Sequence, residues 1–297
     1  MKKRFLQSGA GLTFSVLWAS ASSATKIGLA AAQPFVLSIA RFALAGLLML
    51  GITHGVLRNR LPRGVEWKQL AIYGLLNISI YLGMYVIAMQ HVSPGLGSLA
   101  VATSPVLINL GSTLFFRQPL KRMVLFSLLL CSVGVVLAAW PLLQNSSATP
   151  GGLLILVTSM LAYSGGVLYF SRKPWNDLPM LTINGWQTIL GGLFLVPFLA
   201  LTYDPSRNVL NGKSIGAVLW LAIPVSIVAI QTFLYLLKDD AAKASFWLFL
   251  CPVFGFLIAN VFLHEPIGVY TVAGMALVIA GLYIVQRSKG DGVRGDR

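Results

Sequence analysis

Runs of about twenty apolar residues alternate along the chain with short polar segments. A run of this length is sufficient for a helix to cross the hydrocarbon core of a bilayer, which requires roughly 20 residues. The strands of a membrane barrel would instead alternate apolar and polar positions over about ten residues, and these runs do not. The pattern therefore predicts an all-α integral membrane protein. The ten expected helices cover residues 9–32, 34–53, 69–90, 93–116, 121–142, 151–171, 179–201, 214–237, 241–262 and 267–286.

The composition agrees with a protein that lies almost entirely in the bilayer. Hydrophobic residues make up 57% of the 297 positions and charged residues only 10%, with a mean hydropathy of +0.80, whereas soluble domains carry roughly 25% charged residues. The net charge of +14 has no soluble basic face that would bind nucleic acid, so no nucleic-acid partner is expected. Cys131 and Cys251 both lie inside apolar runs and are interpreted as packing residues. No metal or cofactor is expected.

Lysine and arginine are distributed unevenly between the connections of the predicted helices. If the N-terminus is cytoplasmic, 18 of them lie in inner segments, and only Arg207 and Lys213 lie in outer loops. Because an excess of basic residues marks the cytoplasmic side, both termini are predicted to be cytoplasmic in a multi-pass protein of the inner membrane. The basic N-terminus followed by Ala19-Ser20-Ala21 also resembles a cleaved secretory signal, but the apolar run continues beyond this site and retention is preferred.

The two halves of the chain are similar to each other when the sequence is shifted by 147 positions. The shift superimposes Ser98 on Ser245, Pro105 on Pro252, Val106 on Val253, Leu110 on Leu257, Phe115 on Phe262, Pro119 on Pro266 and Gly134 on Gly281. The expected units are residues 1–143 and 151–297, joined by an outer linker over 144–150. Five is an odd number of spans, so the second repeat begins on the opposite side of the membrane and is inverted. Inverted repeats around a midplane site are typical of alternating-access transporters.

Several short motifs occur in the order seen in a known family. They are Trp18 with Lys26, Pro34, Arg41-Phe42, Ser93-Pro94-Gly95 with Pro105, and later Pro252 with His264-Glu265-Pro266. In this order the chain resembles the drug/metabolite transporter superfamily, EamA type. The resemblance implies ten helices around a central cavity and the export of amino acids or other small metabolites.

Acidic residues avoid the middle of every predicted span. All eight can be placed near span ends or in connections: Glu66, Asp177, Asp204, Asp239, Asp240, Glu265, Asp291 and Asp296. Proton-coupled carriers commonly use a carboxyl group within the membrane, and general acid–base catalysis needs one in reach of the substrate. The sequence therefore predicts neither a buried carboxylate relay nor an enzyme.

Aromatic and amide side chains recur at helical spacing within the spans. Tyr73, Asn77, Tyr81 and Tyr85 follow one another every four residues, which places them on one slowly winding stripe. Such a stripe favours an amphipathic solute over a bare ion, although a single aromatic residue is more often part of the core and Asn77 also fits a helix-to-helix hydrogen bond. The candidate substrate-binding residues are Trp18, Lys26, Asn77, Tyr81, Tyr85, Tyr163, Gln187, Gln231, Tyr235 and Trp247.

Lys26 and Arg41 are the two cations that belong to predicted spans. Charges at that depth face protein or water, so two interpretations remain open. The pair either attracts carboxylates near the outer mouth, or Lys26 reaches the interface while Arg41 clamps helix-end carbonyls or Glu265. Pro105 and Pro252 are expected to kink their helices. We assign gating or structural roles to Arg41, Pro105, Pro252 and Glu265.

The function predicted from these features is that of a secondary transporter of small amphipathic metabolites, working by alternating access. The expected partners are a small-molecule substrate and the lipid bilayer, and a monomer is plausible. Export is implied by the family resemblance alone. The alternatives are an importer of a small metabolite or amine, a channel, and a membrane scaffold that transports nothing. A channel is disfavoured because the sequence has no motif for a selectivity ring.

Overall fold

The computed structural model describes residues 2–117, 122–144 and 149–291, and every regular element in these ranges is helical. Seven helical stretches are long and apolar enough to cross a membrane. They are Pro34–Val56, Val65–Ala88, Pro94–Phe116, Pro150–Arg172, Met180–Thr202, Gly212–Lys238 and Lys243–Leu263. Two shorter apolar stretches cover Arg122–Ala138 and Val269–Gly281. The all-helical architecture expected from the apolar runs is therefore observed, and seven stretches of the described residues have the length and composition of membrane spans, compared with the ten expected.

The first half of the chain consists of α1 (Lys2–Leu29), α2 (Pro34–Leu50) with the π-helical segment η1 (Gly51–Val56), a composite helix, a broken helix and α7 (Arg122–Gln144). The composite helix is formed by α3 (Val65–Gly74), the π-helical η2 (Leu75–Leu82) and α4 (Gly83–Ala88). The broken helix is formed by α5 (Pro94–Val101) and α6 (Ser104–Phe116). Residues 145–148 of the expected linker lie outside the described part of the chain.

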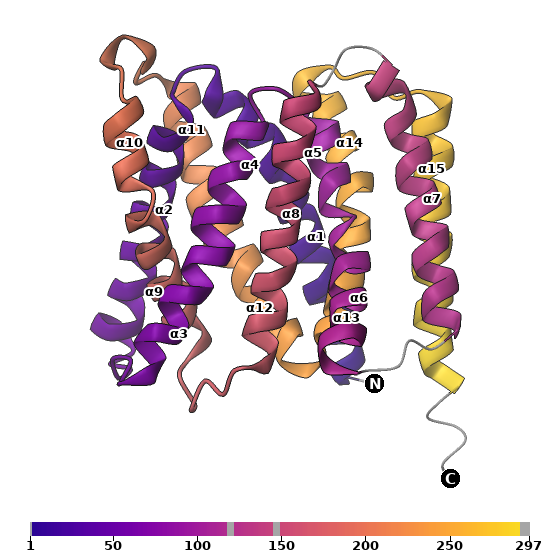
Figure 1. Cartoon of the computed structure of the whole chain (residues 1–297), viewed down its shortest axis with the longest axis horizontal. Coiled ribbons are helices and arrows are strands. Elements are labelled where there is room, and N and C mark those ends of the chain that lie inside the picture. Colours follow the sequence, from indigo (N-terminus) through magenta and orange to yellow (C-terminus); the bar gives the residue numbers. More distant parts are fainter. Residues whose placement is uncertain (1, 118–121, 145–148, 292–297) are drawn as a thin grey trace.

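The regular elements of the second half are also helical in the described residues. This half contains α8 (Pro150–Arg172), α9 (Met180–Leu193) with α10 (Val196–Thr202), the short η3 (Pro205–Arg207), then α11 (Gly212–Trp220), the π-helical η4 (Leu221–Ala229) and α12 (Ile230–Asp239). The chain continues through α13 (Ala241–Ser245), the 3₁₀ segment η5 (Phe246–Leu250), α14 (Cys251–Leu263) and α15 (Val269–Asp291). Figure 1 shows α1 beginning and α15 ending at the same end of the bundle, with α1 and α8 running in opposite directions.

Element boundaries recur at the spacing found in the sequence. Both α6 and α14 have 13 residues, and shifting α6 by 147 positions gives the bounds of α14. The same shift carries α7 onto α15. Each 13-residue helix ends at a residue in the left-handed conformation, Arg117 with φ 52° and His264 with φ 56°. Pro105 and Pro252 lie in the first turn of these helices, where the missing proline N–H costs no intrahelical hydrogen bond.

Small residues bring α7 and α15 into close contact. A Cβ atom added at Gly134 would lie 2.6 Å from the carbonyl oxygen of Gly274, and one added at Gly281 would collide with the Cys131 sulfur. Such approaches are typical of membrane helices packed through small residues. Cys131 and Cys251 are both buried and free, in agreement with their interpretation as packing residues. In Figure 1 the α7–α15 pair stands at one side of the bundle.

Candidate functional site

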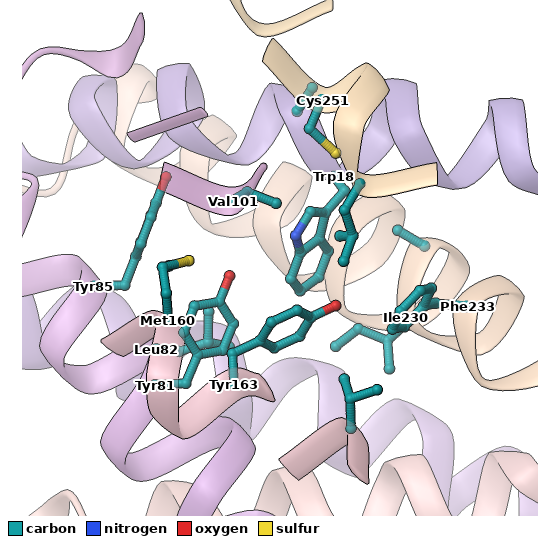
Figure 2. Packing of buried hydrophobic residues seen from close by; sticks show 14 of the residues in the cluster. Trp18, Tyr81, Leu82, Tyr85, Val101, Met160, Tyr163, Ile230, Phe233 and Cys251 are labelled. Atoms are coloured by element: carbon teal, nitrogen blue, oxygen red, sulfur yellow. The ribbon is translucent and has the colours of Figure 1, made fainter. Parts of the chain in front are cut away.

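A cluster of aromatic rings fills the centre of the bundle. Trp18 of α1, Tyr81 of η2 and Tyr163 of α8 are all buried, and the ring centroids of Tyr81 and Tyr163 lie 4.6 Å apart. Trp18 lies 6.4 Å from Tyr81 and 6.3 Å from Tyr163. Figure 2 shows these three rings converging, with Phe233 of α12 beside Tyr163. Sequence reasoning selected Trp18, Tyr81 and Tyr163, and the structure brings them together from both halves of the chain.

Helical spacing explains how α1 contributes to this ring cluster. Phe14 and Trp18 are four residues apart, so they lie on one face, and their ring centroids are 5.7 Å apart. Phe14 also stacks on Phe233 at 4.4 Å. The ring cluster is therefore Phe14, Trp18, Tyr81, Tyr163 and Phe233. The tyrosines spaced by four residues on the third span have different neighbours. The ring centroid of Tyr85 lies 6.0 Å from that of Tyr81, whereas Tyr73 packs on Phe170.

The space around the rings is small. One cavity of about 10 Å³ is lined by Phe14, Trp18, Tyr73, Asn77, Tyr163, Ile230 and Phe233. A second, also about 10 Å³, is lined by Thr25, Leu37, Ser38, Arg41, Leu82, Tyr85, Val86 and Leu221. Each has room for about one water molecule, whereas sites for small ligands usually measure roughly 300–1,000 Å³. The central cavity expected from the sequence is thus filled in this conformation, because the rings pack on one another.

A chain of polar side chains crosses the bundle beside the rings. The Asn77 Nδ2 group donates to Gln187 Oε1 at 3.2 Å, and Gln187 Nε2 donates to Asn184 Oδ1 at 3.1 Å. Asn184 Nδ2 donates to the Ser226 carbonyl oxygen at 3.0 Å, and Arg41 Nε donates to Ser226 Oγ at 2.7 Å. Asn77 and Gln187 are therefore used in helix-to-helix hydrogen bonds, the alternative that the sequence left open for Asn77.

Lys26 and Glu265 lie at the end of the bundle opposite to the start of α1. Lys26 Nζ donates to the carbonyl oxygens of Met89 and Val92 at 2.9 and 3.1 Å, just beyond the end of α4. The backbone N–H of Gly95 donates to Glu265 Oε2 at 3.2 Å. Burial raises the pKa of the Glu265 carboxyl, while the Gly95 N–H and the Lys26 charge act in the opposite direction.

The structure corrects the expectation that Arg41 is the cation that binds carbonyl oxygens at a helix end. Sequence reasoning offered Arg41 as the residue that binds helix-end carbonyls or Glu265. Lys26 makes the carbonyl contacts instead, and the hydrogen bond of the Arg41 side chain goes to Ser226. The reason is the level of each cation in its helix: Lys26 is near the end of α1, whereas Arg41 lies two turns into α2.

Three further candidates come from the second half, Gln231 and Tyr235 in α12 and Trp247 in η5. The interior face of α12 is formed by Ile230, Phe233, Leu234 and Leu237, all buried, and Tyr235 is 41% exposed on the other side. Its expected inward position is therefore wrong. Trp247 packs against Gly11 of α1, and its carbonyl oxygen accepts a hydrogen bond from Ser15 Oγ at 2.8 Å. Gln231 is partly buried, and its Oε1 atom has no partner among the described residues.

Sequence reasoning missed the hydroxyl groups around Tyr85 and Arg41. The Ser22 and Tyr85 hydroxyls lie 2.7 Å apart, and Ser98 Oγ donates to Ser22 Oγ at 3.1 Å. Ser22 falls in the run of small residues from Ala19 to Ala24, where the sequence does not single it out. A single serine among small residues does not alter the hydrophobic pattern of its helix. Its hydrogen-bond partner therefore becomes known only when the structure shows which helix packs against it.

Comparisons with known proteins agree with this architecture. The model of the EamA-like transporter family matches residues 8–140 and 150–287. The chain is 27% identical over 278 residues to an uncharacterized transporter of Archaeoglobus fulgidus, covering 92% of this chain and 95% of that protein. It is 27% identical to Protein PecM of Dickeya dadantii (91% and 89% covered) and 25% identical to the uncharacterized inner membrane transporter YedA of Escherichia coli K12 (95% and 90% covered).

The fold is also similar to that of a solved structure. A crystal structure with 22% sequence identity superimposes with a TM-score of 0.74, covering 94% of this chain and 96% of that one. At this identity the likeness concerns the fold alone. The family model covers both halves of the chain and leaves out only the linker and the ends. The chain belongs to the EamA-like transporter family.

Proposed function

We propose that this protein is a secondary transporter that moves small amphipathic metabolites, amino acids or related compounds, across the cytoplasmic membrane by alternating access, in the direction of export. The observation that carries the proposal is the ring cluster between the two halves. Trp18 and Tyr81 come from the first half and Tyr163 from the second, and the Tyr163 hydroxyl is buried without a hydrogen-bond partner among the described residues. Aromatic faces with such a polar group suit a solute that has both an apolar body and polar ends.

We propose that the two halves are inverted five-helix repeats, which move relative to each other around the ring cluster. The proposal is supported by the 147-residue recurrence of α6 in α14 and of α7 in α15, and by the opposite directions of α1 and α8 in Figure 1. Two π-helical segments also recur, η2 and η4, and π-helical turns occur frequently at functional sites. Two halves that rock about the ring cluster would open it alternately to each side.

The orientation we propose places both termini in the cytoplasm. Figure 1 places the α2–α3 and α8–α9 connections at the end where α1 begins. These connections carry Arg58, Arg60, Arg63 and Lys173, and Arg172 is the last residue of α8 at the same end. The two connections are joined there by a 2.8 Å hydrogen bond from Arg60 to the Asn176 carbonyl oxygen. Since basic residues are retained on the cytoplasmic side, this end is assigned to the cytoplasm.

We propose a carrier rather than a channel, because the rings of Tyr81 and Tyr163 pack together at the centre and the two cavities beside them hold about 10 Å³ each, as expected for a site that opens to one side at a time. No acidic residue lies in the middle of a span, so the driving force we propose is the gradient of the solute itself or of an exchanged solute. Export rests on the character of the family, and import of a metabolite or amine is the alternative.

Flux in proteoliposomes tests the proposal. Purified protein is reconstituted into liposomes. The vesicles are then loaded with one radiolabelled amino acid or amine at a time, and no pH gradient is imposed. We expect saturable release of at least one solute, with none from protein-free vesicles. Strict dependence on an imposed proton gradient would contradict the proposed driving force, and a current of inorganic ions without solute release would favour a channel.

A further inference from the structure

Arg41 carries a charge that has no counter-ion in the described part of the chain. Its side chain is 6% exposed, and no carboxylate oxygen of the described residues lies within the 4.0 Å of an ion pair. Nε donates to Ser226 Oγ at 2.7 Å, but Nη2 is buried and has no hydrogen-bond partner among the described residues. The guanidinium carbon lies 5.3 Å from the centroid of the Phe42 ring, and no carboxylate of the described residues pairs with the planar fork of Nη1 and Nη2.

Burying a charge in this way is costly, since an unpaired ion loses its hydration without gaining the attraction of an opposite charge. Arg41 differs in this respect from Lys26, whose ammonium binds two carbonyl oxygens. It differs also from Arg60, which forms two 2.7 Å hydrogen bonds to the Glu66 carboxylate. A buried polar atom with no partner in a native protein calls for an explanation, and a ligand of opposite charge supplies one.

The surroundings of Arg41 fit a small anionic group. Arg41 lines a cavity together with the hydroxyl-bearing Thr25, Ser38 and Tyr85. Tyr85 in turn lies beside Tyr81, which belongs to the ring cluster. A solute that placed an anion at Arg41 would therefore have its apolar body directed toward the rings.

We infer that Arg41 binds the carboxylate of the transported solute, so that the substrates are small organic acids or zwitterions with an apolar or aromatic body. This inference rests on the proposed transport function and adds the chemical class of the substrate. The guanidinium fork matches a carboxylate through two parallel N–H···O hydrogen bonds. In the closed conformation the cavity holds about one water, so the solute binds when the helices around Leu37 and Leu82 separate.

Acetate and acetamide provide the sharpest test, because they have the same shape and differ in charge. Each is added at equal concentration and constant ionic strength to purified protein, and the thermal midpoint is measured. A ligand that binds only the folded state raises this midpoint. We expect acetate to raise the midpoint of the wild type by about 2–4 °C more than acetamide, and Arg41→Met to abolish this difference. The exposed Lys213→Met variant is the matched control and keeps the difference.

Each outcome decides the inference. Equal effects of acetate and acetamide on the wild type, or an acetate effect that persists in folded Arg41→Met, would overturn it. If Arg41→Met does not fold, Arg41→Lys replaces it, and the acetate effect must shrink because an ammonium lacks the fork. Flux measurements separate this inference from the transport proposal. Transport of amines or amides that is unchanged in the Arg41 variants would refute the carboxylate site and leave the transport proposal intact. Acetate binding through Arg41 without any solute flux would support the carboxylate site and refute the transport proposal.

Discussion

The rings of Tyr81 and Tyr163, with centroids 4.6 Å apart, join the two halves of the chain at the centre of the bundle. Tyr81 comes from the π-helical segment of the third span and Tyr163 from the first helix of the second half. Any motion of one half against the other must change this contact. Its neighbours Trp18 and Phe233 extend the same ring cluster into α1 and α12.

Removing the Tyr163 hydroxyl should not cost stability. The hydroxyl is buried without a partner among the described residues, and an unsatisfied buried polar group costs about 1–3 kcal/mol. We expect Tyr163→Phe to unfold at the same or a higher denaturant concentration than the wild type, while its affinity for the transported solute falls. A loss of more than about 1 kcal/mol in the unfolding free energy would show that the hydroxyl has a partner in the resting protein.

The helix contact between α7 and α15 should tolerate no added methyl group at Gly134. The new Cβ would lie 2.6 Å from the Gly274 carbonyl oxygen, whereas Gly216 of α11 has open space around it. We expect Gly134→Ala to lower the unfolding free energy by about 1–3 kcal/mol through overpacking. Gly216→Ala should raise it by about 0.5–1 kcal/mol. Equal effects of the two substitutions on thermal unfolding would contradict the close approach of α7 to α15.

Glu265 should give stability a pH dependence of defined sign. Its folded pKa is raised above 4.5 by burial, so in the window above pH 4.5 the folded state holds a proton that the unfolded state has released. Stability therefore falls as pH rises through that window, and Glu265→Gln should flatten this part of the profile.

Asp204 is the control, because its contribution to stability should depend on pH with the opposite sign to that of Glu265. Its pKa is lowered, first by the side-chain hydrogen bond from Ser206, so its contribution is lost as pH falls below its ordinary value of 3.8. Thermal midpoints of the wild type, Glu265→Gln and Asp204→Asn across this range distinguish the two. A midpoint that rises with pH above 4.5 only in the presence of Glu265 would reverse the assignment.

Cysteine labelling of intact cells tests the orientation. On a background without Cys131 and Cys251, we expect an impermeant maleimide to modify Ser206→Cys in the exposed α10–α11 connection. Lys173→Cys, exposed in the α8–α9 connection, should react only after the membrane is permeabilised. Labelling of Lys173→Cys in intact cells would place the termini outside.

Much of the helical organisation was predictable because bilayer thickness fixes the length of an apolar run. The runs at 34–53, 93–116 and 151–171 correspond to described helical stretches. Breaks within a run were less predictable. The π-helical η2 and η4 leave the apolar pattern unchanged, so only the backbone reveals them. Gly64, with φ +48°, lies in a connection where the sequence pattern sets no conformation.

The site was predictable where side chains are large and periodic. Trp18, Tyr81, Tyr85 and Tyr163 were selected for ring size and spacing, and all are buried at the centre. Tyr235 satisfied the same spacing rule with Gln231, but the rule cannot say which face of α12 meets the bundle, and this ring is exposed. Ser226 was missed because a hydroxyl in an apolar run gives no sign of the arginine that it contacts.

Solute affinity in matched ring variants tests the central claim, that the ring cluster forms the binding site, most directly. Tyr81→Ala removes a buried ring and Tyr235→Ala an exposed one, so the pair controls for residue type and substitution. A stacked ring contributes about 0.5–1.5 kcal/mol beyond its area, which corresponds to roughly 2–13-fold in affinity. We predict at least this loss of solute affinity in folded Tyr81→Ala and none in Tyr235→Ala. Unchanged affinity in monodisperse Tyr81→Ala, or an equal loss in both variants, would contradict the claim.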